Sequence, residues 1–182
     1  MEEDRKDIEA TLAGDNEAYS HLVQRYQKPV YFTALRMLKN TEDADEVTQK
    51  TFLKAYRALA GFRFESSFKT WLTTIVMNLC RTELMKKKRE MVELPETLAD
   101  PSYQEKRENE EADHQKSELK NALDSLPVRQ REVVTLRIYQ EMPFKDIARV
   151  LESTETAVKV NFHHAMKSLK NWIGKKVQDD VL

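Results

Sequence analysis

Phe144-Lys145-Asp146-Ile147-Ala148-Arg149-Val150-Leu151, then Glu152-Ser153-Thr154, then Glu155-Thr156-Ala157-Val158-Lys159 is the stretch that decides the fold class. The small side chain of Ala148 allows two helices to approach, a short polar turn follows, and Ser153 is placed to cap a second helix. This pattern predicts a helix-turn-helix, whose second helix enters the DNA major groove. Any antiparallel helix pair with a short turn would show a similar pattern, so the prediction needs support elsewhere.

The composition of the whole chain also favours helices. The 182 residues include Gly 3 and Pro 5, far fewer than turn-rich β folds use. Charged residues make up 34% and hydrophobic residues 40%, which is typical of amphipathic helices covered by solvent. No apolar run approaches the roughly 20 residues of a membrane span. The acidic start Met1-Glu2-Glu3-Asp4 is unlike a secretory signal, so we expect a cytoplasmic protein.

The net charge of -1 conceals three blocks of different sign. Residues 1–89 carry 16 basic and 13 acidic side chains, residues 90–118 carry 3 and 10, and residues 119–182 carry 11 and 8. We therefore expect an all-α protein with two small helical domains, 1–89 and 119–182, joined by a flexible acidic linker over 90–118. The C-terminal domain contains the predicted helix-turn-helix.

Helical spacing and capping residues place the expected helices. Asp15 or Asn16 can cap the first long helix, Thr41 opens the next, and Gly61 ends it. Ser66 or Ser67 can cap a third helix that runs to the basic cluster Lys86-Lys87-Lys88-Arg89. Further helices are expected from about Val128 to Tyr139, from Phe144 to Leu151, and from Ser153 to about Val177.

Aromatic and basic residues alternate around the loop before the third helix. Such a mixture suits single-stranded DNA, because unstacked bases find aromatic faces while cations follow the phosphates. Core packing is the competing explanation, and we expect it to hold for Trp71 and Ile75, which share one helical stripe. The cluster consists of Phe62, Arg63, Phe64, Phe68, Lys69, Trp71, Asn78, Arg81 and the basic run Lys86-Lys87-Lys88-Arg89.

Two further groups of residues bear on function. An acidic patch at a helix start contains Asp43, Asp45, Glu46 and Gln49, with Phe52 beyond; it fits either a docking surface for a basic partner or simple helix-dipole stabilisation. Signals of enzyme chemistry are lacking, because no glycine-rich phosphate loop occurs and the histidines His21, His114, His163 and His164 lack metal-ligand spacing. We therefore expect no active site, metal or cofactor, and we expect the lone Cys80 to be a buried apolar residue.

Together these residues resemble the extracytoplasmic-function (group IV) sigma factors of bacterial RNA polymerase. The matching stretches follow in order along nearly the whole chain, with a variable linker between the second and the third. They are Asp43-Ala44-Asp45-Glu46-Val47-Thr48-Gln49-Lys50-Thr51-Phe52-Leu53-Lys54-Ala55-Tyr56, then Phe68-Lys69-Thr70-Trp71-Leu72 with Ile75 and Asn78, then Leu123-Asp124-Ser125-Leu126-Pro127 with Gln130-Arg131-Glu132-Val133, and finally the helix-turn-helix.

The resemblance implies a promoter-specificity subunit that binds core RNA polymerase and promoter DNA, both duplex and melted, under the control of an anti-sigma factor. It implies polymerase docking by the acidic patch, through Asp43, Asp45, Glu46, Gln49 and Phe52. It implies recognition and melting of the minus-ten element by Phe62, Arg63, Phe64, Lys69, Trp71 and Asn78. It implies recognition of the minus-thirty-five element by Glu155, Thr156, Lys159, Asn161 and His163.

The chain departs from the family pattern in three respects, one of which is that Ala157-Val158-Lys159 retains only part of the usual start of the recognition helix. The recognition helix has Asn161, His164 and Met166 where arginines are common in the family, which implies weaker and less salt-dependent DNA binding there. Glu46 stands where Asp is usual and keeps the charge.

Two other functions compete with the sigma-factor interpretation. One is a helix-turn-helix regulator that binds duplex DNA without polymerase, which would leave the loop aromatics and the acidic patch without a role. The other is an adaptor or structural α-protein that binds no DNA.

Overall fold

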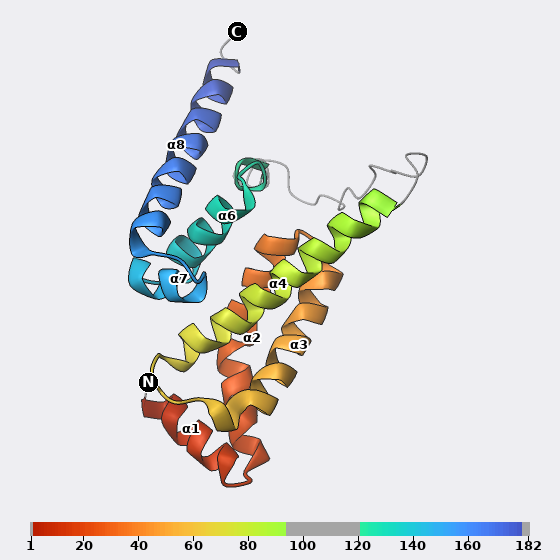
Figure 1. The fold of residues 1–182 in the computed structure, drawn as a ribbon, viewed down its shortest axis with the longest axis vertical. Helices are drawn as coiled ribbons and strands as arrows, with labels where there is room; N and C mark the ends of the chain where they lie inside the picture. The colour runs from red at the N-terminus through yellow and green to blue at the C-terminus, as the bar shows by residue number, and fades with distance from the viewer. Residues whose placement is uncertain (1, 94–120, 180–182) are drawn as a thin grey trace.

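The computed structural model describes the backbone over residues 2–93 and 121–179, and side chains over 2–90 and 121–172 (Figure 1). Within these ranges every regular element is a helix, which confirms the predicted all-α fold. The expected linker, residues 90–118, lies outside the described residues from position 94 onward. The elements are α1 (Glu2–Leu12), α2 (Asn16–Leu38), α3 (Thr41–Ala58), η1 (Leu59–Gly61), α4 (Phe68–Glu93), α6 (Val128–Val134), η3 (Thr135–Tyr139), α7 (Phe144–Val150) and α8 (Glu155–Asp179).

Side-chain caps set the starts of the helices. The carboxylate of Asp15 accepts hydrogen bonds from the backbone N–H groups of Glu17 and Ala18, at 2.9 and 3.3 Å. The hydroxyl of Ser67 accepts from the backbone N–H of Thr70 at 3.0 Å. Each cap satisfies backbone donors that the first helical turn leaves free. The predicted starts of α2 and α4 are therefore confirmed, with Asp15 and Ser67 as the capping residues.

The cap of the last helix lies one residue later than predicted. The hydroxyl of Thr154, and not that of Ser153, accepts from the backbone N–H of Ala157 at 3.1 Å. The Ser153 backbone N–H instead donates to the carbonyl of Ala148 at 2.9 Å and closes the turn after α7. The prediction of Ser153 as the cap was wrong, because that residue completes the end of the preceding helix.

The N-terminal helix α1 is fastened to α2 by a polar cluster. The guanidinium of Arg25 donates to Asp4 at 2.5 Å and to Asp7 at 2.9 Å, and the Tyr26 hydroxyl donates to Asp4 at 2.8 Å. Burial and the Asp4 carboxylate raise the pKa of Tyr26, so its hydroxyl remains a donor at neutral pH. These contacts join residues about twenty positions apart and fix α1 beside the long helices.

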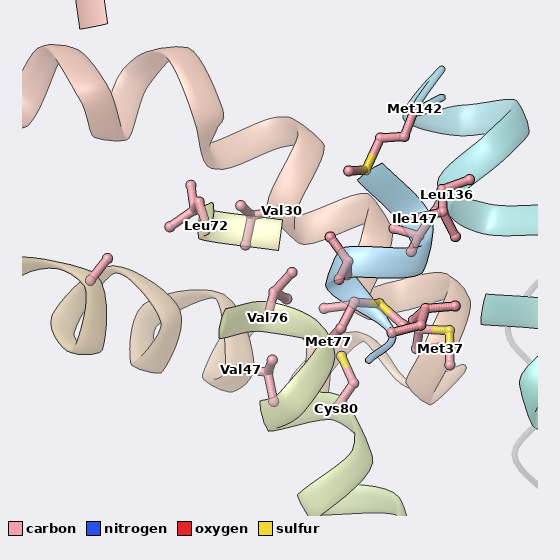
Figure 2. Packing of buried hydrophobic residues seen from close by; sticks show 14 of the residues in the cluster. Val30, Met37, Val47, Leu72, Val76, Met77, Cys80, Leu136, Met142 and Ile147 are labelled. Atoms are coloured by element: carbon pink, nitrogen blue, oxygen red, sulfur yellow. The ribbon is translucent and has the colours of Figure 1, made fainter. Parts of the chain in front are cut away.

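The C-terminal helices pack on the N-terminal bundle through a shared apolar core. Leu136, Met142 and Ile147 lie in the same buried cluster as Met37 and Met77 (Figure 2). In Figure 1, α6 and α7 lie on the side of the bundle formed by α2 and α4, with α7 in contact with α4, and α8 packs on α6 and α7. A second, smaller cluster is internal to the C-terminal half and consists of Ala122, Leu126, Val134, Ala165 and Leu169.

The only cysteine, Cys80, is fully buried, as expected, and should react only when the protein unfolds. Burial raises the pKa of its thiol to about 12, so at pH 8 only about one thiol in ten thousand is ionised. We expect iodoacetamide to alkylate the native protein at pH 8 at least about a hundredfold more slowly than the urea-unfolded protein. Mass spectrometry over time measures both rates, and equal rates would contradict this burial.

Candidate functional site

A cluster of aromatic rings joins the loop before α4 to the first turn of α4. The ring centroid of Phe62 lies 4.8 Å from that of Phe64 and 5.1 Å from that of Trp71, and Phe68 lies 5.6 Å from Trp71. Phe62 is only 8% exposed, whereas Phe64 and Trp71 are half-buried. Trp71 and Ile75 pack against the main core, which confirms the core packing expected for them.

Phe64 is held in an unusual backbone conformation. Its φ of 57° lies in the left-handed region, which costs a non-glycine residue about 1–2 kcal/mol. The guanidinium of Arg5, on α1, lies 4.4 Å from the centre of the Phe64 ring. A cation over an aromatic face contributes about 0.5–1 kcal/mol at exposed sites. Helix α1 therefore helps to hold the loop in place.

A cavity of about 240 Å³ opens between this loop and the start of α4. Its lining combines two aromatic side chains, two guanidinium groups, a hydroxyl and a carboxylate. Such a mixture can stack a flat heterocycle and hydrogen-bond its edge, and the volume suits one base rather than a larger ligand. The lining residues are Gly61, Phe62, Arg63, Glu65, Ser66, Trp71 and, from α7, Arg149.

Of the other predicted minus-ten residues, Phe64 lies on the loop beside Phe62, whereas Lys69 and Asn78 lie on α4 and contact other groups. The Lys69 ammonium donates to the backbone carbonyl of Gln140 at 2.7 Å. The Asn78 side-chain oxygen accepts from Arg81 at 3.3 Å, and Asn78 is half-buried. The structure thus brings Phe62, Arg63 and Trp71 together at the cavity, but places Lys69 and Asn78 beside the C-terminal half.

Only some residues of the predicted acidic docking patch are exposed. Asp45, Glu46 and Gln49 are exposed on α3, whereas Asp43 is half-buried and forms an ion pair with Lys87. Phe52 is 8% exposed and belongs to the core.

Two apolar side chains missed by the sequence reasoning continue the exposed face of α3, Leu53 at 59% and Tyr56 at 46% exposure. Helical spacing from Gln49 would have indicated both. The Glu46 carboxylate lies 2.6 Å from the Lys50 ammonium, which lowers the pKa of Glu46 and keeps it ionised.

The predicted recognition residues do not all share one face of α8. Glu155, Thr156, Lys159 and His163 are exposed, and a 2.7 Å ion pair joins Lys159 to Glu155. Asn161 is half-buried, and its amide donates back to the carbonyl of Ala157 at 2.8 Å. The exposed face also carries Val160 and Met166, at 48% and 42% exposure, which the sequence reasoning did not assign to DNA contact.

Two other kinds of feature are absent from the described parts of the chain. Over those residues, no three His, Cys, Asp or Glu side chains gather as metal ligands would; His114 lies outside them. Nor does any described helix combine the length and apolar character needed to cross a bilayer.

Comparisons with known proteins identify the family. Residues 22–90 match the family model of sigma-70 region 2, and residues 116–169 match that of sigma-70 region 4. The RNA polymerase sigma-H factor of Pseudomonas aeruginosa is 28% identical over 185 residues, covering 93% of each chain. The ECF RNA polymerase sigma-E factor of Escherichia coli is 29% identical over 177 residues, covering 90% of this chain and 91% of that protein. The chain belongs to the extracytoplasmic-function group of the sigma-70 family.

Solved structures share the fold of this sigma factor. Bartonella quintana RpoE, in complex with the anti-sigma factor NepR, gives a TM-score of 0.73 at 20% identity, covering 86% of this chain and 96% of that one. CnrH, in complex with the cytosolic domain of CnrY, gives 0.72 at 23% identity, covering 95% and 98%. As a sigma factor, the protein directs promoter-specific initiation by core RNA polymerase, which decides against a polymerase-independent regulator and a structural adaptor.

Replacing Arg5 by alanine should loosen the loop of this sigma factor without unfolding the bundle. The lost cation–π contact is worth about 0.5–1 kcal/mol, so amide hydrogen exchange in residues 62–67 should accelerate about two- to fivefold. Exchange in α2 and α3 should stay the same. Lys6→Ala removes an exposed neighbouring cation and serves as the control. Unchanged exchange in the loop of the Arg5 variant would show that α1 does not hold Phe64.

Proposed function

We propose that the cavity beside Trp71 captures one unstacked base of the minus-ten element during promoter melting. The observation that carries this proposal is the juxtaposition of an aromatic face with the Arg63 guanidinium at an open cavity within the region 2 match. Stacking of a base on an aromatic side chain contributes about 1–3 kcal/mol. Binding the separated strand lowers the free energy of the melted promoter relative to the duplex, so this step needs no catalysis by the sigma factor.

The other predicted sites complete the function. The exposed face of α8, with Thr156, Lys159 and His163, reads the minus-thirty-five element in the major groove. The exposed face of α3, with Asp45, Glu46 and Gln49, docks on a basic surface of core polymerase, and Leu53 supplies apolar contact.

Phe52 and Asn161 act indirectly in this proposal. Phe52 is a core residue that supports α3, and Asn161 is turned inward on α8.

Control by an anti-sigma factor is part of the same proposal. The fold is shared with Bartonella quintana RpoE, whose structure is a complex with an anti-sigma factor. The protein itself carries out no chemical step in this proposal, and it acts in the cytoplasm, where core polymerase is found.

Arg63→Ala and Trp71→Leu should impair promoter opening far more than polymerase association. The first removes a cation that contacts phosphate, and should reduce the slope of log affinity against log salt by about 0.7 for single-stranded DNA. The second removes the stacking surface, and should weaken binding of forked DNA about tenfold. Fluorescence anisotropy with holoenzyme and run-off transcription measure the two effects.

Controls separate loss of function from loss of folding. Trp71→Phe retains an aromatic face and should recover much of the binding lost in Trp71→Leu. Lys28→Ala removes an exposed cation of α2 away from the cavity and should bind forked DNA normally. If Trp71→Leu and Trp71→Phe bind equally well, Trp71 serves only to pack the core, and the stacking role is wrong.

Glu46→Lys should impair polymerase association far more than promoter opening. The charge reversal replaces the Glu46–Lys50 ion pair by two positive charges one helical turn apart. It also removes an attraction to a basic partner. Association with core polymerase, measured by surface plasmon resonance, should weaken at least about tenfold. Glu9→Lys on α1 makes the same charge change away from α3 and is the matched control. Equal weakening by both variants would indicate only a general charge effect.

A further inference from the structure

Helix α8 has one side against the protein and the opposite side in solvent. The buried residues of its described part are Val158, Ala165 and Leu169. Since each residue of an α-helix advances about 100° around the axis, these three lie within about 40° of one another. The positions directly opposite them therefore form the part of α8 that lies farthest from the core.

Four exposed residues occupy these opposite positions and form an outer stripe along α8. Their spacing of three or four residues keeps them within about 60° around the helix axis. Val160 is the second member of the stripe and is 48% exposed. The stripe consists of Thr156, Val160, His163 and Lys167.

The turn before α8 determines which end of the outer stripe faces DNA. The backbone N–H of Ser153 closes the end of α7, and the hydroxyl of Thr154 caps α8. In a helix-turn-helix, the second helix places its N-terminal residues against base edges in the major groove. Thr156 and Val160 are the second and sixth residues of α8, so both lie in that part of the helix.

Val160 does not contribute to the packing of the protein. Among the described residues, it belongs to neither of the two apolar clusters. A β-branched side chain is also a weaker helix former than alanine, so a valine at an exposed position does not stabilise α8. Single apolar residues are common on protein surfaces, and the exposure of Val160 matters because of its place on the outer stripe.

The two methyl groups of a valine match only one feature of the major groove. Base edges there present hydrogen-bond donors and acceptors, and thymine also presents an apolar C5-methyl group. Contact of a valine with a donor or acceptor would remove that group from water without giving it a partner. Contact with the thymine methyl group removes two apolar surfaces from water, which is favourable.

The other residues of α8 leave this contact as the most selective one. Thr156, His163 and Lys167 carry polar groups that can bond to several bases or to phosphate. The Lys159 ammonium, beside the stripe, lies 2.7 Å from the Glu155 carboxylate. The sequence of α8 contains no arginine, which is the side chain that most often recognises guanine.

We infer that Val160 is a specificity-determining residue that selects a thymine in the minus-thirty-five element by contact with its C5-methyl group. The inference deepens the proposed recognition of that element by α8 and rests on it. Val160 accordingly discriminates thymine from cytosine and from uracil, because neither of these bases carries a methyl group at C5.

Replacement of thymine by deoxyuridine tests the inference, because it deletes the methyl group and leaves the base pairing unchanged. Holoenzyme first selects duplexes from a pool with a randomised promoter region, and the thymines of the enriched upstream element are then replaced one at a time. At one position, or at two adjacent positions, the replacement should weaken binding about fourfold, as expected for one buried methyl group. Fluorescence anisotropy at a fixed salt concentration measures the affinities.

Val160→Ala shows which residue contacts the methyl group. This variant should bind the thymine duplex about fourfold more weakly, and should bind the deoxyuridine duplex about as tightly as the unmodified protein does. Its sensitivity to the replacement should therefore fall below about twofold. Val128→Ala removes the same methyl groups at a 44% exposed position of α6 and is the matched control, which should retain the full sensitivity. Thermal unfolding verifies that both variants are folded.

The inference and the proposed function fail in different ways. An enriched upstream element without thymine on either strand, equal binding of all deoxyuridine duplexes, or full sensitivity in Val160→Ala would overturn the inference and leave the function of α8 intact. Equal loss of sensitivity in Val128→Ala and Val160→Ala would also overturn it. If no upstream sequence is enriched and Lys159→Ala binds duplex DNA like the unmodified protein, α8 does not recognise the element, and the inference is wrong together with the proposed function.

Discussion

Glu132 imposes the strongest physical constraint on this structure. Its carboxylate is 1% exposed, and a charge removed from water in this way needs a cation and hydrogen bonds nearby. Arg129 on the same helix provides one contact, and Arg81 on α4 provides the shorter one. The C-terminal half thus satisfies its buried charge by lying against the N-terminal half, and the apolar contacts of Ile147 and Leu136 follow from that placement.

The contact between the two halves combines the apolar cluster around Ile147 and Leu136 with buried polar groups. An interface made only of apolar side chains would gain free energy from every Å² buried, and would be difficult to open. Here Gln140 exchanges its hydrogen bonds for bonds to water when the halves separate, so its net contribution is small, although it specifies the orientation.

Features set by nearby residues could be predicted from the sequence, whereas contacts between distant residues could not. Helix starts at Asp15 and Ser67 depend on residues two or three positions away, and the helix-turn-helix depends on about fifteen consecutive residues. The contact between Gln140 and Thr33 joins residues 107 positions apart, and no periodicity indicates it. The sequence also does not show which side chains of α8 are exposed. Asn161 has the position expected of a recognition residue, but it is half-buried and its amide donates to the Ala157 carbonyl of its own helix.

The loop before α4 shows why a strained conformation can serve recognition. Phe64 is held in the left-handed region at a cost of about 1–2 kcal/mol, and the contacts of its ring with Arg5 and Phe62 offset a cost of that size. A loop fixed before its ligand arrives loses little further conformational entropy on binding. In the proposed mechanism, free energy from stacking of a base on Trp71 is then available for separating the DNA strands rather than for ordering the protein. Helix α1, which the Arg25–Asp4 contact holds against α2, therefore helps to fix the loop that borders the cavity. It does so although it precedes the region 2 match.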